Sequence, residues 1–255
     1  MATSPASARS HAITVLIVAV CLMLGALGGW WWQARSISAD PARGLSAGDR
    51  AAIEKVVSDY LLEHPEILPK AFDALQKREN ANALSAIRSD VERPYNGAIM
   101  GNPAGKITLV EFTDFACTFC RRSVADVEAL IAANPDLKVV IRELPILSPE
   151  SADAAKMGLA AAEQGKYAAF HRAMFAAGRP DKSTIEAAAR AAGVDLARAQ
   201  KVLADPLTEQ ELAKNIEIAR QLGFTGTPSW VVGNAILSGA VGQDKLAKAI
   251  ADARS

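Results

Sequence analysis

Two cysteines three residues apart, at the junction of a predicted strand and a predicted helix, constrain this chain more than any other feature. Cys117 and Cys120 follow a short β-rich run, ITLVEF, at residues 107–112. Because residues i and i+3 of a helix are neighbours, the two sulfurs can join and separate with little backbone movement. Cys117 would begin the helix, where the dipole and free N–H groups favour a thiolate and lower its pKa. Cys120, one turn further in, would then be the resolving thiol of a redox pair.

The alternative interpretation of CxxC is half of a zinc site, which would need two further ligands. Cys21 is the only other cysteine, and it lies in an apolar stretch. The three histidines do not form ligand spacings: His11, His64 and His171. CxxC beside a strand–helix–strand pattern is typical of redox proteins. We therefore expect a redox pair, with no metal and no other cofactor.

The charge balance argues against a nucleic-acid partner. The 28 Lys and Arg residues equal the 28 Asp and Glu residues, and the basic residues are scattered along the chain. Nucleic-acid binding needs a basic face, so none is expected. Three cysteines are also too few for a small scaffold held together by disulfides.

Residues 12–32 contain no charged side chain and end in three tryptophans. As a helix this run is about long enough to cross a ~30 Å hydrocarbon core, and tryptophans suit a membrane interface. The alternative is a cleaved signal peptide, whose apolar region is normally shorter, although residues 36–38 form an acceptable cleavage site before Ala39. We expect residues 1–38 to be a transmembrane anchor or signal segment with a linker, which places the remainder outside the cytoplasm.

A helical hairpin is predicted in residues 39–95. Ser46 and Asp49 have the spacing of a capping box, and His64-Pro65 ends the first helix. A second helix is expected over residues 69–92. The hairpin could pack on its own domain or form an oligomerisation stalk, because its apolar positions do not keep one heptad register.

Residues 96–255 have the pattern of an α/β domain. A strand–helix–strand unit implies a parallel pair with a right-handed crossover. A mainly helical block follows, from a Ser-Pro helix start to about residue 223. Two strands joined at Gly233-Asn234 and a final amphipathic helix end the chain. The expected elements are strands at 107–112, 137–144, 229–232 and 235–238, and helices at 117–133, within 148–222 and at 243–253. This order predicts a thioredoxin-like fold with an inserted helical domain at about 148–223.

The chain resembles the DsbA-like family of bacterial thiol–disulfide oxidoreductases. The motifs that carry the resemblance are VEFTDFACTFCRR at 110–122 and GTPSWVVG at 226–233, with the helical block between them. The sequence DYLLEHPEIL at 59–68 is similar to the N-terminal stalk of the ScsC-like branch. The resemblance covers residues 96–255 and the hairpin, about four-fifths of the chain. It implies a periplasmic location.

The resemblance also implies roles for individual residues. Cys117 would be the exposed redox cysteine and Cys120 the resolving one. Thr227 and Pro228 would form a substrate-docking loop opposite the pair, with Pro228 in a cis peptide bond rather than an ordinary trans turn. Glu111 would be the buried acid that accepts or relays the proton of Cys120.

These residues fit several functions. Thr118-Phe119 replaces the Pro-His dipeptide of the most oxidising members, so the thiolate lacks a nearby positive charge and the disulfide should be less oxidising. A disulfide oxidase competes with an isomerase or reductase, with a redox-independent peptide-binding chaperone, and with a reductase facing the cytoplasm. The expected partners are client proteins, a membrane redox partner, the membrane itself and further copies of the chain.

Overall fold

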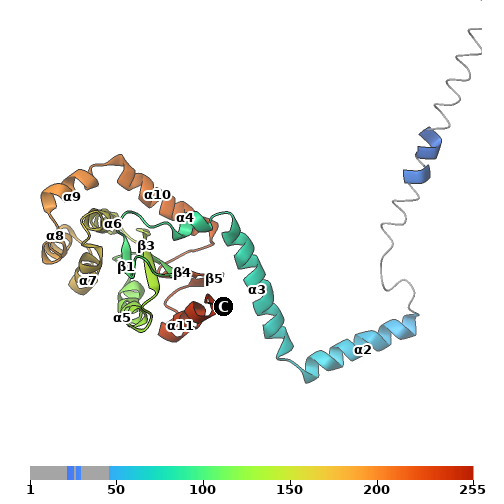
Figure 1. Ribbon diagram of the computed structural model, residues 1–255. Coiled ribbons are helices and arrows are strands. Elements are labelled where there is room, and N and C mark those ends of the chain that lie inside the picture. Colours follow the sequence, from blue (N-terminus) through green and yellow to red (C-terminus); the bar gives the residue numbers. More distant parts are fainter. Residues whose placement is uncertain (1–21, 26, 30–45, 255) are drawn as a thin grey trace, which may run out of the picture. The chain divides into compact units, whose positions relative to one another are not determined.

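The computed structural model describes residues 22–25, 27–29 and 46–254 (Figure 1). The chain divides into two units, Met1–Lys70 and Ala71–Ser255. Among the described residues, no helix combines the length and apolar character that crossing a bilayer requires. Most of the predicted apolar segment at 12–32, Cys21 included, and the linker up to residue 45 lie outside the described residues.

Helices make up most of the described chain. Their bounds are α2 (Ala47–Glu63), α3 (Ile67–Ser85), α4 (Arg88–Glu92), α5 (Thr118–Ala133), α6 (Pro149–Ala162), α7 (Tyr167–Ala177), α8 (Lys182–Ala191), α9 (Leu196–Leu203), α10 (Pro206–Gln221) and α11 (Gln243–Asp252). The expected cap is present at the start of α2, where Ser46 and Asp49 form a capping box. Ser148 likewise caps α6, with Pro149 in its first turn.

Five strands form one mixed sheet in the order β1-β3-β2-β4-β5. Their bounds are β1 (Ile99–Gly101), β2 (Ile107–Thr113), β3 (Leu137–Glu143), β4 (Ser229–Val232) and β5 (Ala235–Ser238). The predicted β2–β3 pair is parallel, and the remaining pairs are antiparallel. The thioredoxin-like α/β fold predicted from the sequence is therefore confirmed.

Side chains alternate between two apolar layers, as a sheet covered on both faces requires. Leu109, Val139 and Ile141 pack with α5 and α11 in one cluster. On the other face, the apolar cluster joins the sheet to α10, to the end of α3 and to α4. A third cluster combines α6 to α9 with Phe115 and the two CxxC cysteines. Figure 1 shows α6 to α9 gathered at one end of the sheet.

The prediction of one continuous helix at 69–92 is wrong. The structure breaks it into α3 and α4 at Ala86-Ile87, where Ile87 has φ −120° and ψ 0°. Leu84 before the break and Val91 after it are both fully buried in the cluster with α10. Because side chains seven residues apart lie on the same face of an unbroken helix, the burial of this pair does not by itself require the break.

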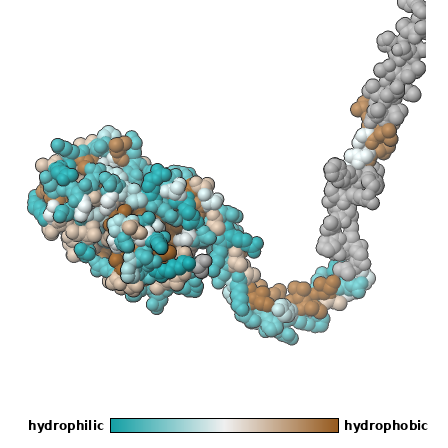
Figure 2. Space-filling view, viewed as in Figure 1, coloured by the Kyte–Doolittle hydropathy of each residue, from teal (hydrophilic) through white to brown (hydrophobic). Residues whose placement is uncertain are grey.

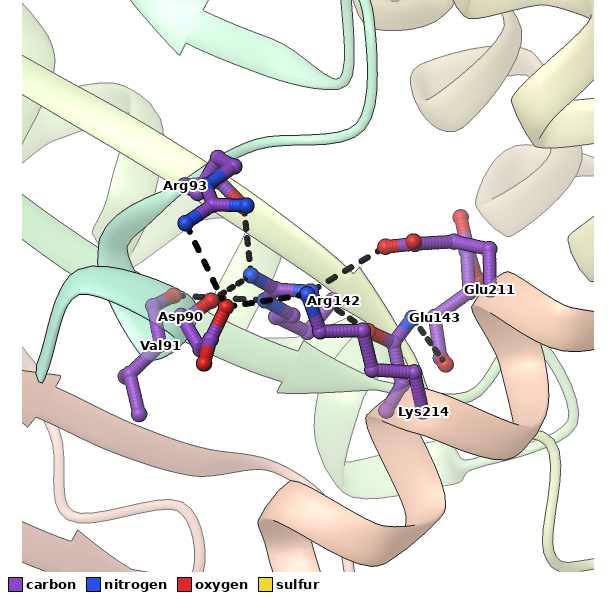
Figure 3. Close-up of polar contacts among 8 residues, drawn as sticks. Asp90, Val91, Arg93, Arg142, Glu143, Glu211 and Lys214 are labelled. Carbon is purple, nitrogen blue, oxygen red and sulfur yellow. Dashed lines mark hydrogen bonds and ion pairs between the residues drawn. The ribbon is translucent and has the colours of Figure 1, made fainter. Parts of the chain in front are cut away.

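A buried arginine fastens α4 to the sheet. Arg142 of β3 is 1% exposed, and its guanidinium enters the layer between β3, α4 and α10 (Figure 3). It donates hydrogen bonds to Asp90 O, Val91 O, Arg93 O, Asn215 Oδ1 and Glu211 Oε1. Because a buried charge is tolerated only when it is paired and hydrogen-bonded, this set of partners explains how an arginine occupies a core position.

Candidate active site

Cys117 occupies the N-cap of α5, one residue before the helix begins, as the sequence predicted. Its Sγ accepts a hydrogen bond from the backbone N–H of Cys120 at 3.3 Å. In its protonated form the Cys117 thiol also donates to the carbonyl oxygen of Thr227 at 3.2 Å. Both cysteines are free thiols, so the structure has the dithiol form. Cys117 is 5% exposed and Cys120 is fully buried. Cys117 is thus less exposed than expected, although it alone of the pair reaches the surface.

The surroundings of the two thiols shift their pKa values in opposite directions. A hydrogen bond from the Cys120 side chain, helped by the side chain of Thr227 and by the backbone N–H groups of Cys120 and Phe119, lowers the pKa of Cys117 from 9.0 to about 6. Burial, followed by the contact with Cys117 and the field of Glu111, raises the pKa of Cys120 far above its ordinary value. At neutral pH the outer sulfur is therefore a thiolate and the inner sulfur a thiol, which suits a nucleophile and a resolving group.

Thr227 and Pro228 lie in the loop between α10 and β4. The peptide bond that joins them is cis, which confirms the expectation for Pro228. The contact from Thr227 O to Cys117 brings this loop, 110 residues away in sequence, against the start of α5. Ser229 Oγ donates to Gly226 O at 2.8 Å and so closes the loop on itself.

Glu111 lies in the middle of β2, between Ile141 of β3 and Trp230 of β4. The residue is 2% exposed, and burial raises the pKa of its carboxyl to about 8. Its field reaches Cys120, whose pKa it raises. The structure therefore brings the predicted residues together: the two cysteines, the Thr-Pro loop and the acid. A carboxyl that titrates near neutrality beside a buried thiol has the acidity that proton exchange requires.

Asp114 was not predicted from the sequence as part of this site. It is 1% exposed. Its Oδ1 accepts from the N–H of Ala116 at 2.8 Å, and its Oδ2 accepts from Ile146 and Leu147 at 2.9 and 3.0 Å. It therefore joins the turn before Cys117 to the loop after β3. The bond to the N–H two residues ahead is an Asx turn, the local pattern that could have revealed it.

A further polar cluster, also missed, lies at the end of β3. Glu143 is fully buried, and its Oε1 accepts from the Tyr167 hydroxyl at 2.6 Å. His171 contacts Phe115 edge-on and lies tilted against Tyr167, and burial lowers the pKa of its imidazole to about 3, so it is neutral. Tyr167 and His171 are one turn apart on α7, but Glu143 meets them only through tertiary packing, so no sequence pattern relates it to them. Among the residues that the structure describes, no three His, Cys, Asp or Glu side chains are grouped as metal ligands.

Comparison with known proteins agrees with this geometry. Residues 108–251, more than half of the chain, match the family model of the DSBA-like thioredoxin domain. The chain belongs to the DsbA-like family. Residues 49–82 match a second family model, the N-terminal domain of the copper resistance protein ScsC. DsbA-like proteins with this fold are thiol–disulfide oxidoreductases.

Solved DsbA-like structures resemble the chain over most of their own length. A thioredoxin-like oxidoreductase from Silicibacter pomeroyi is 39% identical, with a TM-score of 0.63 over 66% of this chain and 97% of the other. A linker-deletion mutant of Proteus mirabilis ScsC is 29% identical, with a TM-score of 0.62 over 82% and 97%. A periplasmic thioredoxin-like protein from Salmonella enterica is 25% identical, with a TM-score of 0.60 over 66% and 95%.

Curated relatives include much longer proteins. The chain is 28% identical over 144 residues to the Na(+)/H(+) antiporter NhaA 3 of Salinispora tropica. That alignment covers 22% of the antiporter, and a second antiporter, from Salinispora arenicola, is covered over 25%. The matched region is therefore a small part of those proteins.

Proposed function

We propose that this protein exchanges disulfides with client proteins through Cys117 and Cys120. The proposal rests on the two thiols at the start of α5, where the pKa of Cys117 is lowered and that of Cys120 is raised. In the oxidised form, a client thiolate attacks Cys117 Sγ, the Cys117–Cys120 bond breaks, and Cys120 leaves as a thiolate. A second client thiolate then attacks the client sulfur of the mixed disulfide and releases Cys117. The client is oxidised by two electrons, and the cysteine pair is reduced. An isomerase or reductase begins instead with the Cys117 thiolate attacking a client disulfide.

Glu111 and the Thr-Pro loop have supporting roles in this proposal. When Cys120 leaves as a thiolate it takes a proton from the Glu111 carboxyl, and it returns that proton when it attacks again. Thr227 presents its backbone beside Cys117. With Pro228 it would pair with an extended client peptide and hold the client sulfur in line with the pair.

The test is the reduction potential of the Cys117–Cys120 pair, measured by equilibration with glutathione buffers. A potential near about −120 mV indicates net disulfide formation with an oxidising membrane partner, and one at about −200 mV or below indicates isomerase or reductase work. Cys117→Ala should abolish client oxidation and reshuffling, whereas Cys21→Ala, which changes the only other cysteine, should leave both intact. If no reversible disulfide forms, or if Cys117→Ala retains full activity as a chaperone would, the proposal is wrong.

A specific observation favours the isomerase or reductase as the second candidate. Helix α2 has no buried residue, and Ile53, Val56, Val57 and Tyr60 are each about half exposed or more. Figure 2 shows apolar side chains gathered on this helix. Water-exposed apolar stripes of this kind mark interaction surfaces. We propose that residues 39–95 include an oligomerisation stalk, which lets several redox domains surround one misfolded client.

Substitutions in α2 test whether this helix mediates oligomerisation. Val56→Gln removes an apolar side chain from the stripe, and Lys55→Gln is the matched control at a polar position of α2 that pairs with Asp59. Light scattering of the full-length protein should give a smaller mass for Val56→Gln alone. Equal masses for wild type and both variants, all of them monomeric, would remove the stalk from the proposal.

We further propose that the protein acts in the periplasm, attached to the inner membrane through residues 12–32 or released after cleavage. The uncharged run with its terminal tryptophans supports this location, as does the periplasmic relative from Salmonella enterica. Fractionation and N-terminal sequencing of the native protein distinguish the anchored form from the cleaved one. Recovery in the cytoplasm would contradict both.

A further inference from the structure

Two buried acids share one face of the sheet beneath the CxxC helix. Leu109 of β2 and Ile141 of β3 face the layer that contains α5. By strand alternation Glu111, Thr113 and Glu143 face the same layer. Thr113 pairs directly with Glu143 across β2 and β3. Glu143 is thus the diagonal neighbour of Glu111, and both carboxyls are almost entirely removed from water.

The surroundings of Glu143 are shaped around its carboxyl group. The Tyr167 hydroxyl donates to Oε1 at 2.6 Å. On the facing helix α6 stands Gly158, where a Cβ atom would lie 2.9 Å from Glu143 Oε1. The glycine therefore leaves the space that the carboxyl fills.

Three oxygen atoms of this layer are buried without a hydrogen-bond partner among the described residues: Glu111 Oε2, Thr113 Oγ1 and Glu143 Oε2. An unpartnered buried polar atom costs stability and is uncommon, and here three come from two adjacent strands. The Thr113 hydroxyl lies near enough to favour the ionised forms of both Glu111 and Cys120. The orphan oxygens therefore belong to three residues on one face of two adjacent strands, two of which, Glu111 and Thr113, influence the resolving thiol.

The charged groups whose fields reach Glu143 are acids. Burial, then the fields of Asp114 before α5 and of Glu111 on β2, raise the pKa of Glu143 well above its ordinary value. From α7, Tyr167 is an uncharged donor, and the neighbouring His171 is neutral. From α10, Asn215 contributes an uncharged amide bonded to the Glu143 carbonyl. With no cation supplied by these groups, Glu111 and Glu143 each disfavour ionisation of the other.

We propose that Glu143, held by Tyr167, is a positioning residue that shares with Glu111 the proton that Cys120 exchanges. This inference rests on the proposed function. Two neighbouring buried carboxyls that disfavour each other's ionisation titrate as a pair, and in their singly ionised form either one can hold the charge. When Cys120 gives up its proton, the pair changes from singly to doubly protonated, and the reverse transfer restores its charge. Glu143 competes with Glu111 for that charge and so sets how readily Glu111 accepts the proton.

The experiment follows the reaction of each thiol as a separate kinetic phase. The full-length reduced protein, with Cys21→Ala as background, is mixed with the aromatic disulfide 5,5′-dithiobis(2-nitrobenzoate) in a stopped-flow instrument. In the first phase the Cys117 thiolate breaks the reagent's disulfide and releases one coloured thiolate. In the second, Cys120 loses its proton and attacks Cys117 Sγ, which closes the protein disulfide and releases the second coloured thiolate. The rate of each phase is recorded against pH.

The proposal predicts a change in the second phase alone. In the wild type the second rate should rise over a wider pH range than a single ionisation allows. In Glu143→Gln it should rise as one ionisation and reach its full value about one pH unit lower, the scale at which two acids titrate as a pair. Tyr167→Phe, which removes the donor that favours ionised Glu143, should shift the profile in the same direction by less. The first phase should keep its pH dependence in all variants.

Tyr95→Phe is the matched control, because it removes a different Tyr–Glu hydrogen bond, the one to Glu163. It should superimpose on the wild type. A Glu143→Gln profile that matches the wild type while Glu111→Gln changes the second phase would overturn the proposal, and so would equal shifts of both phases, which indicate a structural role. If Glu143→Gln does not fold, Tyr167→Phe decides by the same criteria. Absence of a second phase in the wild type would instead refute the proposed function.

Discussion

Replacing the inner cysteine tests how the outer one becomes acidic. The largest cause of the low pKa of Cys117, about 6, is a hydrogen bond from the Cys120 side chain. Cys120→Ala removes this donor and leaves the Thr227 side chain and the backbone N–H groups in place. Cys120→Ser keeps a hydroxyl donor at the same position. We therefore expect the pKa of Cys117 to rise toward 9.0 in the alanine variant and to stay low in the serine variant.

The size of the effect depends on the quantity measured. At pH 7 a thiol with a pKa of about 6 is about 90% ionised, and one with a pKa of 9.0 is about 1% ionised. The thiolate of a weaker acid is, however, the better nucleophile. With a Brønsted coefficient of about 0.4–0.5, three pKa units raise its intrinsic reactivity by roughly 16- to 32-fold. The net loss of alkylation rate at pH 7 is then only about 3- to 6-fold, even if the whole pKa shift disappears.

The direct assay is therefore the ultraviolet absorbance of the thiolate, titrated against pH in each variant after Cys21→Ala. A midpoint near 6 in Cys120→Ser, with a midpoint displaced toward 9 in Cys120→Ala, supports the reasoning. Equal midpoints in the two variants would refute it, because the donor atom at position 120 would then be irrelevant. The helix terminus and Thr227 would in that case account for the acidity alone.

Three further substitutions test the buried polar groups. Arg142→Ala should lower the free energy of unfolding by roughly 3–5 kcal/mol, measured by denaturant titration, because it leaves its buried partners unpaired. Glu111→Gln should stabilise the protein increasingly as pH rises from about 4.5 toward 8, since a raised pKa in the folded state means that folding opposes ionisation; equal stability of both proteins at pH 8 would contradict this. Gly158→Ala should cost about 1–3 kcal/mol, because its Cβ would crowd Glu143 Oε1, and a neutral effect in the same titration would show that the carboxyl moves freely.

Local signals explain what could be predicted from the sequence. The strand at 107–112, the Ser46 and Ser148 caps and the turn at Gly233-Asn234 each depend on residues close in the chain. The position of Cys117 at the N-cap follows from the same local logic. The cis peptide at Pro228 required the resemblance to a known family, because a Thr-Pro pair alone favours the trans form.

What could not be predicted depends on distant partners. Strand β1 has only three residues and exists because Ile99–Gly101 pairs with β3. The break between α3 and α4 has no glycine or proline to predict it, and it lies between Leu84 and Val91, which are both buried with α10. Glu143 has the local sequence of an ordinary strand end, and only the approach of Tyr167 from α7 reveals its environment. For β1 and for Glu143, a contact across the fold outweighs the local preference.

The arginine that joins α4 to the sheet has a mechanical consequence. Arg142 belongs to β3, which is hydrogen-bonded to a neighbour on each side, β1 and β2. Tension applied to the chain before α4 meets the hydrogen bonds from Arg88 to Gly233 O and Asn234 Oδ1, and then the Arg142 bonds to residues 90, 91 and 93. It passes from there into the β4–β5 turn and into the interior strand β3 rather than into α5, which begins at the redox pair. A client pulling against a tethered N-terminus would strain this anchor before it disturbed the spacing of the two sulfurs.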